Sequence, residues 1–491
     1  MNRNPIEIFD TTLRDGTQGE GVTLSVKDKV RIAIRLDEFG MDFIEGGWPG
    51  SNPKDESFFK EIRKEKLHHS RICAFGSTAR FPDKVLSDAN LNLMLAAETS
   101  VVSIFGKAWK LHSELGLELD ASENETLIYE SIQYLKSEGR HVIFDAEHFF
   151  DGYKDDPEFA LQMVKAAGKA EADTIVLCDT NGGSLPSEIS DIVHVVKKKI
   201  SAPLGVHAHN DSELAVSNTI AAVEAGVSHV QGTINGVGER CGNANLISII
   251  PNMILKLGLK TVQKIDLTQL SSISHFVSEV MNFASDQRAA YVGRSAFAHK
   301  GGIHVSAVLK NSTMYEHIEP EIVGAQRRVL VSDLSGQSNI RYKASELDVR
   351  LNGDKTLTKK VVNRIKALEH AGYQFDGAEA SFELMMRDAL GQKEIFFQFI
   401  GFRVIVEKRK EDEEPISEAT VKLRVNSIQE VSSAEGTGPI NALDKAIKKA
   451  LVKFYPELER VNLYDYKVRI LDEKKGTRAK TRVLVESGDN H

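Results

Sequence analysis

The chain has 491 residues, of which 41% are hydrophobic and 27% are charged, and its formal net charge is −8 at pH 7. This length exceeds one ordinary hydrophobic core, so two or three globular domains are expected. The acidic balance argues against nucleic acid or an anionic membrane as a partner, and no apolar run is long enough to span a bilayer.

The N-terminus and the cysteines indicate the compartment. The opening segment MNRNPIEIFD runs directly into a strand-like pattern and lacks the apolar core of a signal peptide. Cys73, Cys178 and Cys241 lie far apart and form no CxxC pair, which predicts neither a disulfide framework nor a zinc finger. We expect a cytoplasmic protein in a reducing environment.

Strand-like apolar runs alternate with helical patterns over roughly the first 250 residues, which is the usual size of a (β/α)8 barrel. Two of the helical patterns, 25–40 and 212–226, begin with a serine suited to the N-cap and end in glycine. This alternation predicts an α/β fold, a closed (β/α)8 TIM barrel. A doubly wound open sheet is the alternative, but no GxGxxG follows the first strand. The expected strands are 6–13, 42–47, 71–76, 100–106, 141–149, 174–183, 203–210 and 229–239.

Two further regions follow the predicted barrel. Residues from about 320 to 372 have mainly helical patterns, after a helix and a Gly-rich loop. The segments 396–409 and 418–426 alternate like antiparallel strands, with the charge run 407–415 expected as a solvated loop. An amphipathic helix and a hairpin complete the chain. We therefore expect a catalytic barrel over 1–275, a helical linker region over 276–375 and a C-terminal α+β regulatory domain over 376–491.

Polar and ionisable residues gather at the C-terminal ends of the predicted strands, where barrels of this type place their active sites. Each residue alone has an ordinary explanation, such as a turn, a helix cap or a surface ion pair. Their density at one rim nevertheless favours a functional site. These residues are Arg14, Asp15, Glu45, Glu147, Asp179, Thr180, His207, His209, Asn235, Glu239 and Asn243.

The motif GVHAHND contains two histidines that share one face of the seventh strand, because successive strand side chains alternate between faces. Strand eight neighbours both strand seven and strand one in a closed barrel, so Asp15 can approach His207 and His209 across the rim. Two imidazoles and one carboxylate form a facial set that leaves open positions. The sequence therefore predicts a catalytic site for a divalent metal, Mn²⁺, Mg²⁺ or Zn²⁺.

The motifs FDTTLRDGTQ, HAHND and GVGERCGNANL resemble the pyruvate-carboxyltransferase-like metallolyase barrels. This family includes isopropylmalate, homocitrate and citramalate synthases and hydroxymethylglutaryl-CoA lyase. The motif HKGGIHVSA resembles the linker of the synthases, and SSAEGTGPINALDKAIKKAL resembles their regulatory domain, so the resemblance covers nearly the whole chain. Within the family, IEGGWPGSNPKD and FDAEHFFDGYK are most similar to the citramalate synthase branch.

The resemblance implies roles for the rim residues. Asp15, His207 and His209 match metal ligands, and Asn243 matches an asparagine in or beside the metal shell. Arg14 matches the catalytic arginine, which stabilises a developing enolate or alkoxide oxygen.

Further residues match substrate-side and linker positions. Glu147 and Thr180 match substrate-side groups, with Thr180 holding the carboxylate of the keto acid, and Gln18 and Glu45 match pocket positions. His304 and Tyr315 match residues that the linker of one subunit places over the barrel of its partner, which implies a homodimer. We expect His304, together with Glu147, to act in proton transfer. Bulky walls for a small keto acid are expected from Phe75, Leu95 and Phe105.

The implied reaction is the condensation of acetyl-CoA with pyruvate to a 2-hydroxy dicarboxylate and free CoA. The closest alternative is 2-oxoisovalerate as the acceptor, as in 2-isopropylmalate synthase. A metal-dependent hydrolase barrel typically carries its HxH motif after strand one, and a non-catalytic amino-acid sensor does not need the intact rim. The tail resembles a leucine- or isoleucine-binding domain, so we expect isoleucine as an inhibitor.

Overall fold

The structure is a computed structural model that describes residues 4–332, 334–347, 355–375, 378–408, 415–470 and 478–489. The centre of the expected charged loop, residues 409–414, and the turn of the expected C-terminal hairpin, residues 471–477, lie outside the described residues. The chain divides into two compact units, one formed by 1–297 and 316–327 and the other by 298–315 and 328–491. Among the described residues, no helix combines the length and apolarity needed to cross a membrane.

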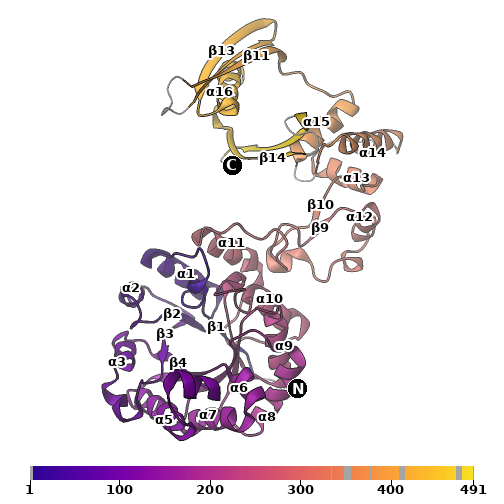
Figure 1. The fold of residues 1–491 in the computed structure, drawn as a ribbon. Coiled ribbons are helices and arrows are strands. Elements are labelled where there is room, and N and C mark those ends of the chain that lie inside the picture. Colours follow the sequence, from indigo (N-terminus) through magenta and orange to yellow (C-terminus); the bar gives the residue numbers. More distant parts are fainter. Residues whose placement is uncertain are drawn as a thin grey trace. The chain divides into compact units, whose positions relative to one another are not determined.

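The first unit contains a closed parallel barrel, which confirms the predicted TIM-barrel fold (Figure 1). Within residues 4–297, eight strands pair in chain order, and the first also pairs with the last. The strands are β1 Glu7–Asp10, β2 Phe43–Gly47, β3 Arg71–Ser77, β4 Val101–Lys107, β5 His141–Glu147, β6 Thr174–Asp179, β7 Leu204–Ala208 and β8 His229–Gly232. The last strand is therefore much shorter than the predicted strand 229–239.

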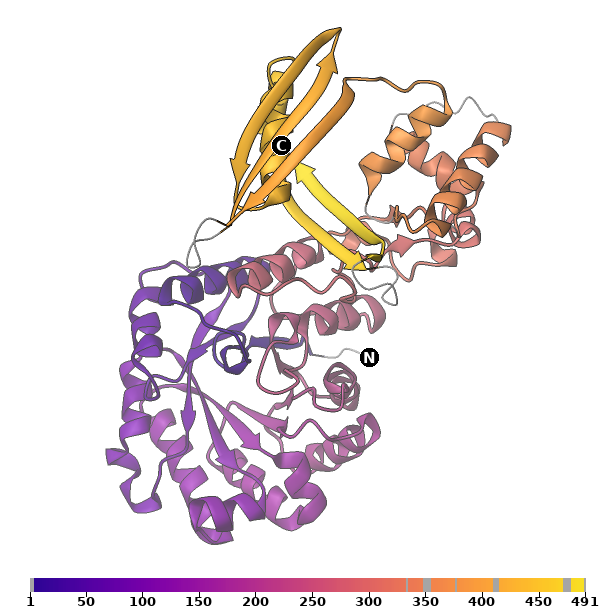
Figure 2. The ribbon, with the colours of Figure 1, turned by 45° about the horizontal axis from the view of Figure 1, so that its top comes forward.

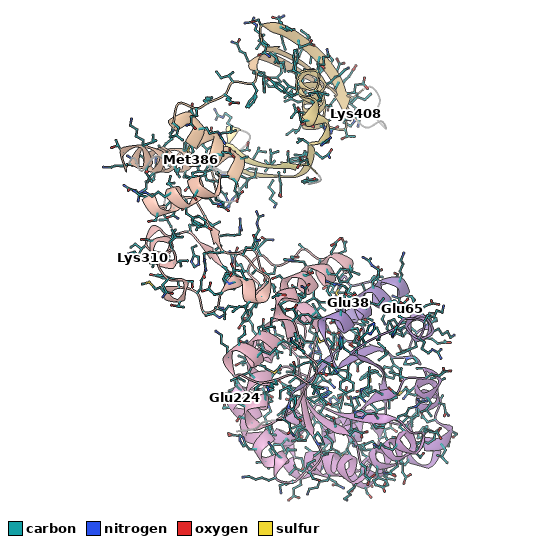
Figure 3. All side chains as sticks on the ribbon, turned by 180° about the vertical axis from the view of Figure 1, so that it is seen from behind. Glu38, Glu65, Glu224, Lys310, Met386 and Lys408 are labelled. Carbon is teal, nitrogen blue, oxygen red and sulfur yellow. The ribbon has the colours of Figure 1, made fainter. Side chains whose placement is uncertain are left out.

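Helices surround the strands (Figure 2), and the charged side chains of Glu38, Glu65 and Glu224 are exposed on the outer surface of this unit (Figure 3). A capping box at Ser25 starts the first helix, as predicted. The predicted cap at Ser212 is wrong, since α9 begins three residues later and the Ser212 hydroxyl donates to the Gly182 carbonyl. The helices of this unit are α1 Val26–Phe39, α2 Pro53–Ile62, α3 Ala89–Ala96, α4 Lys110–His112, α5 Ala121–Ser137, α6 Phe149–Asp155, α7 Pro157–Lys169, α8 Pro186–Lys197, α9 Ala215–Ala225, α10 Leu246–Pro251 and α11 Leu270–Val280.

The interior of the barrel changes from apolar to polar along its strands. Alternate residues of each strand face inward, and near the N-terminal ends they form a buried apolar cluster that includes Phe43, Val101 and Ile143. Two positions further along the same three strands stand Glu45, Ser103 and Asp145, and all three are buried. This polar layer lies directly below the rim where the predicted site residues gather.

A buried carboxylate anchors the end of α1. Asp37 accepts hydrogen bonds from the backbone N–H groups of His68, His69 and Ser70 at 2.8, 2.8 and 2.7 Å. Burial alone raises the pKa of Asp37, but these three donors outweigh it and hold the pKa below its usual value. The carboxylate therefore fixes the loop that leads into β3.

Replacing Asp37 by asparagine is expected to lower the free energy of unfolding by about 1.5–3 kcal/mol at pH 7, because an amide cannot accept all three bonds. A depressed pKa contributes stability that is present above the unfolded pKa of about 3.9 and is lost as the pH falls through the folded pKa. The difference between the two proteins should therefore shrink below pH 4, which denaturant unfolding at several pH values measures. The exposed helical Asp191→Asn variant is the control, and an equal loss in both variants contradicts the anchoring role.

The second unit contains a helical part. Strands β9 Ala298–His299 and β10 Arg328–Val329 pair in parallel, and α12 Gly302–Val308 follows β9. Helices α13 Gln337–Glu346, α14 Lys355–His370 and α15 Glu379–Ala389 share a small apolar core. Phe382 and Met386 of α15 belong to this core, so α15 packs with the helices that precede it.

The rest of the second unit is an α+β arrangement. Strands β11 Gln398–Glu407, β12 Ile416–Val425 and β13 Ile428–Gly436 form an antiparallel sheet, and β14 Asn462–Ile470 pairs with β15 Thr481–Gly488. Helix α16 Pro439–Leu451 covers the three-stranded sheet with Ala442, Ala446 and Ala450, which pack against alternate residues of β12. Small alanines four residues apart let the helix approach the sheet closely. The predicted sheet, amphipathic helix and hairpin strands are confirmed.

Candidate metal centre and active site

The turn after β1 carries two of the predicted site residues to the barrel mouth. Thr12 donates both its backbone N–H and its hydroxyl to the Asp10 carboxylate, at 2.9 and 2.8 Å. The Thr12 hydroxyl in turn accepts the Ile234 N–H at 2.9 Å, which ties this turn to the segment after β8. This local network directs Arg14 and Asp15 across the mouth toward β7.

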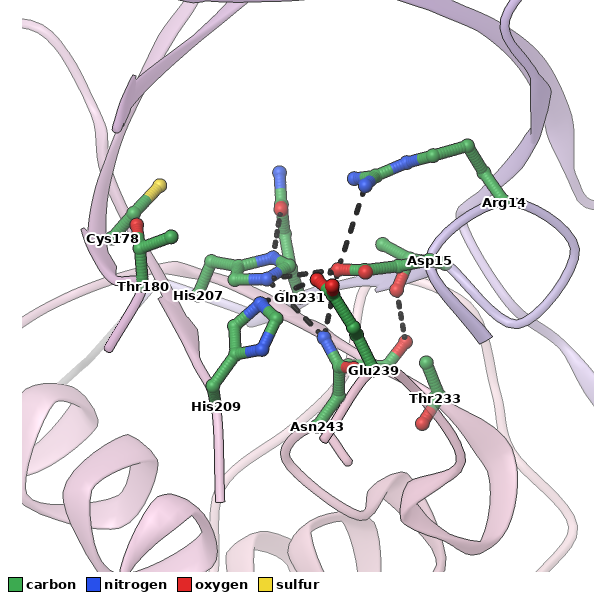
Figure 4. Close-up of polar contacts among 12 residues, drawn as sticks. Arg14, Asp15, Cys178, Thr180, His207, His209, Gln231, Thr233, Glu239 and Asn243 are labelled. Carbon is green, nitrogen blue, oxygen red and sulfur yellow. Dashed lines mark hydrogen bonds and ion pairs between the residues drawn. The ribbon is translucent and has the colours of Figure 1, made fainter. Parts of the chain in front are cut away.

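Asp15, His207 and His209 bring their ligand atoms within 4.8 Å of one another, and all three are buried (Figure 4). Asp15 Oδ2 lies 3.2 Å from His207 Nε2 and 3.6 Å from His209 Nε2. Burial alone raises the pKa of Asp15, but the adjacent Arg14 and His207 outweigh it and hold this pKa well below its usual range. Burial and the neighbouring His207 lower the pKa of His209 to about 4, so its ring is neutral at pH 7. An ionised carboxylate and a neutral imidazole are the forms that bind metals.

Asn243 lies beside this cluster, and the orientation of its side-chain amide shows whether it could also bind a metal there. Its Nδ2 donates to Asp15 Oδ2 at 2.8 Å and lies 3.3 Å from His207 Nε2, while its buried Oδ1 has no hydrogen-bond partner among the described residues. A flip of the amide exchanges these atoms and turns the unpartnered oxygen toward the cluster. Two imidazoles, one carboxylate and one amide oxygen then suit a divalent cation of Mg²⁺, Mn²⁺ or Zn²⁺ character.

Arg14 is held rigidly beside the cluster. Its Nε donates to Glu45 Oε2 at 2.7 Å, its Nη1 lies 3.5 Å from Asp15 Oδ2, and its Cζ lies 3.8 Å from the centre of the Phe75 ring. Burial alone lowers the pKa of Arg14, but the Glu45 and Asp15 carboxylates outweigh it and raise this pKa. Burial raises the pKa of Glu45 to about 7 although the arginine opposes it. A fixed cation therefore stands beside the cluster, where it can stabilise a developing oxyanion.

A cavity of about 350 Å³ opens at this mouth, and its lining includes Asp15, His207, His209, Arg14, Gln18, Glu147, Thr180 and Glu239. Glu147 is paired with Lys107. Thr180 Oγ1 accepts the His148 N–H at 2.8 Å, which leaves the Thr180 hydroxyl proton available to a ligand. The polar lining and the fixed cation suit a small carboxylate-bearing molecule.

Three aromatic rings form one wall of this cavity. Trp48 meets Phe75 and Phe105 edge-on, each at 5.7 Å between centroids, and these two phenylalanines stack at 5.5 Å. The Trp48 Nε1–H donates to Asn90 Oδ1 at 2.7 Å, which fixes the indole. The expected wall residue Leu95 lies instead on α3, where it packs against the core between helices and strands.

Two predicted rim residues serve the fold. Asp179 accepts hydrogen bonds from the Ser184 hydroxyl at 2.9 Å and from Asn218, and it does not line the cavity. Asn235 donates to Ser274 O at 2.8 Å and thereby ties the loop after β8 to α11. For both residues the ordinary structural explanation holds.

His304 and Tyr315 belong to the second unit. Their rings stack on each other with 4.3 Å between centroids, and both side chains are exposed. Their expected role over a barrel stays a prediction.

Four residues around the site were missed in the sequence: Trp48, Asp145, Gln231 and Arg240. Arg240 Nη2 donates to Thr180 O at 2.7 Å and lies 3.1 Å from His209 Nδ1. Gln231 Oε1 lies 2.8 Å from His207 Nδ1. Asp145 and Gln231 stand two positions after inward-facing residues, so strand periodicity could have identified them. Trp48 directly follows β2, and its aromatic ring at a strand end was the available signal.

Three family models match successive segments that together make up most of the chain. The HMGL-like family model matches residues 5–277, the homocitrate synthase post-HMGL domain-like model matches 291–372, and the LeuA allosteric (dimerisation) domain model matches 376–491. The HMG-CoA lyase structure from Bacillus subtilis aligns with a TM-score of 0.50 and 20% identity over 58% of this chain and 97% of its own, which shows the barrel fold.

Curated relatives match over nearly the full length. A Geobacter sulfurreducens protein named (R)-citramalate synthase is 54% identical over 99% of this chain and 92% of its own length. An Aquifex aeolicus protein of the same name is 51% identical, again over 99% of this chain and 92% of its own. A Methanocaldococcus jannaschii protein named 2-isopropylmalate synthase is 33% identical over 98% of this chain and 88% of its own.

Proposed function

This chain belongs to the HMGL-like family, with its nearly full-length relatives named (R)-citramalate synthase, and on that premise we propose that it condenses acetyl-CoA with pyruvate to give (R)-citramalate and CoA. The observation that carries the proposal is the buried cluster of Asp15, His207 and His209 beside Arg14, at the edge of an aromatic-walled cavity. This arrangement combines a divalent-metal ligand set with a fixed cation. It supports an acyltransferase that acts on a small 2-oxo acid.

The cluster and Asn243 hold the metal in this proposal. The metal supplies Lewis-acid polarisation of the keto group when it is bound. Arg14 stabilises the negative charge that develops on the keto oxygen, and the Thr180 hydroxyl donates to the substrate carboxylate. Gln18 and Glu45 shape the pocket, with Glu45 acting through the Arg14 guanidinium that it orients.

Proton transfer is assigned to the predicted base. His304, supplied by the linker of the partner subunit, takes a methyl proton from acetyl-CoA, with Glu147 assisting and Tyr315 placing the imidazole through the ring stack. The resulting carbanion equivalent attacks the keto carbon of pyruvate and forms the new carbon–carbon bond. Water then cleaves the thioester, so acetyl-CoA, pyruvate and water yield citramalate and CoA.

The test is thiol release from acetyl-CoA with pyruvate, 2-oxoisovalerate or 2-oxoglutarate, each with and without EDTA. EDTA-sensitive release with pyruvate alone is the expected result. A preference for 2-oxoisovalerate moves the assignment to 2-isopropylmalate synthase, the alternative named for a more distant relative. No release with any of the three acids overturns the proposed reaction and favours a non-catalytic amino-acid sensor.

The preference for pyruvate is assigned to the aromatic wall of Trp48, Phe75 and Phe105, whose bulk is proposed to limit the side chain of the keto acid. Replacing Phe105 by alanine should raise the kcat/KM ratio of 2-oxoisovalerate to pyruvate by about 10-fold or more, since each methylene is worth roughly 1–3 kcal/mol in such a pocket. Competing-substrate assays measure this ratio. Phe81→Ala, at an exposed phenylalanine outside the cavity, is the matched control, and an equal ratio in both variants contradicts the wall assignment.

The C-terminal part is proposed to form a homodimer. The match to a LeuA allosteric (dimerisation) domain supports this, and so do the large apolar side chains of β11 that stand exposed in one chain, such as Phe399 and Phe402 at 47% and 59% exposure.

The proposed effector is isoleucine, since citramalate leads toward that amino acid. Its carboxylate is proposed to bind at Glu435–Ala442, which runs from the end of β13 into the N-terminus of α16.

Isoleucine is expected to inhibit the full-length protein about fivefold or more, and removal of the chain after Ala389 should abolish this inhibition. The cut leaves α15 intact, so Phe382 and Met386 keep their place in the helical core. Initial rates with isoleucine, with leucine and without effector provide the measurement. Inhibition that persists in the truncated protein ends the regulatory assignment.

A further inference from the structure

A chain of hydrogen bonds crosses the barrel interior below the metal cluster. Gln231 on β8 is fully buried, and its Oε1 lies 2.8 Å from Nδ1 of His207 on β7 (Figure 4). Its Nε2 donates to Asp145 Oδ1 on β5 at 3.0 Å. The other oxygen of Asp145, Oδ2, accepts the Ser103 hydroxyl on β4 at 3.0 Å. Four strands of the barrel thus contribute to one connected network.

The chemistry of these groups determines the direction of the bonds. Asp145 Oδ1 accepts from Gln231 Nε2 and Asp145 Oδ2 accepts from the Ser103 hydroxyl, and an ionised carboxylate offers only acceptors. The amide of Gln231 must therefore turn Nε2 toward Asp145 and Oε1 toward the histidine. An amide oxygen can only accept, so His207 Nδ1 carries the hydrogen.

The same bond leaves the other ring nitrogen ready to bind a metal. With the hydrogen on Nδ1, Nε2 is the ring nitrogen of His207 that is left to offer a lone pair to a metal, and it lies 3.2 Å from Asp15 Oδ2 in the cluster. The neighbouring His209 has a different environment, since its Nδ1 faces the partly exposed Arg240. Of the two ligand histidines, His207 is the one oriented by a buried neutral acceptor.

We propose that Gln231 is a positioning residue that sets the tautomer and ring orientation of His207 for metal binding, and that Asp145 sets the orientation of Gln231. This inference rests on the metal site of the proposed function. A glutamine that merely satisfies buried polar groups has no effect on the metal, whereas a positioning glutamine controls metal affinity through the acceptor that it presents to Nδ1.

The test is calorimetric titration of the chelator-treated full-length protein with Mn²⁺ alone. Gln231→Met keeps the length of the side chain but removes the acceptor, and it should raise the Mn²⁺ dissociation constant about 10–100-fold. Ser103→Ala is the matched control, because it removes the bond beyond Asp145 and leaves the contact between Gln231 and His207. We expect its dissociation constant to stay within about threefold of the wild-type value.

A rescue variant separates positioning from folding. Gln231→Glu combined with Asp145→Asn exchanges the acceptor and the donor, so the new carboxylate accepts from His207 Nδ1 and the new amide donates to that carboxylate. This double variant should regain Mn²⁺ affinity to within about threefold of wild type. Wild-type affinity in Gln231→Met, or affinity in the double variant as weak as in Gln231→Met, overturns the positioning role. Failure of the wild-type protein to bind Mn²⁺ overturns the metal site itself, and the first titration reveals it.

Discussion

Replacing Arg14 by lysine is expected to lower kcat for CoA release about 10²–10³-fold, which is the usual loss when one donor to a developing oxyanion is removed. The guanidinium meets Glu45, Asp15 and the Phe75 ring at once, at 2.7, 3.5 and 3.8 Å. An ammonium is a compact point charge and cannot make these planar contacts together. Because lysine keeps the positive charge, the loss of kcat measures what the planar contacts of the guanidinium contribute.

The expected change falls on kcat more than on KM for pyruvate, because Arg14 is assigned to charge that develops only as the carbon–carbon bond forms. Steady-state kinetics with pyruvate varied at saturating acetyl-CoA distinguish the two parameters. Arg35→Lys is the control, since Arg35 pairs with Glu38 on the outer surface of α1. A kcat for Arg14→Lys within about threefold of that control removes Arg14 from the reaction.

Replacing Asp15 by asparagine is expected to abolish metal-dependent activity at metal concentrations that saturate the wild type. Asp15 supplies the carboxylate of the candidate cluster, and its Oδ2 lies 2.8 Å from the side-chain amide of Asn243. An uncharged amide removes the attraction for a divalent cation and changes the partner of Asn243. The dissociation constant of the metal should rise beyond the roughly 10–100-fold that the loss of an outer-shell partner costs.

Thermal unfolding gives a readout of this change that is independent of turnover. A metal at about 100 times its dissociation constant stabilises the folded barrel by about 2.7 kcal/mol, so Mn²⁺ should raise the melting temperature of the wild type and not that of Asp15→Asn. Asp151→Asn provides the comparison, because Asp151 lies near the mouth but bonds to Asn181 outside the cluster. An equal Mn²⁺ shift in wild type and Asp15→Asn shows that the metal binds elsewhere.

Much of the fold could be predicted from local pattern. Eight apolar runs separated by helical segments specify a barrel because parallel neighbours need a crossover of helix length. Boundaries were less predictable: the eighth strand was expected over 229–239, but β8 ends at Gly232 and a 3-10 turn follows at Ile234–Gly236. Thr233 and Ile234 stay buried beyond the end of the strand, so burial alone does not mark where the strand ends.

The residues of the candidate site also differ in whether the sequence alone could identify them. His207 and His209 could be paired from the sequence because residues two apart share a strand face, and closure of the barrel brought Asp15 to them. Leu95 could not be excluded from the wall in advance, because its apolar character suits either the cavity or the core beside α3. Asp179 and Asn235 look like rim ligands in the sequence, but partners on α9 and α11 satisfy them.

The sequence by itself determined the barrel, the location of its mouth and the candidate metal-ligating side chains, because strand periodicity and strand ends are local properties of the chain. Only the tertiary structure decided which groups surround those ligands. Gln231, Asp145 and Trp48 reach the site from strands and turns far apart in the chain, through contacts such as the 2.8 Å approach of Gln231 to His207. Such contacts depend on inter-strand register and side-chain direction, which arise only when the barrel closes.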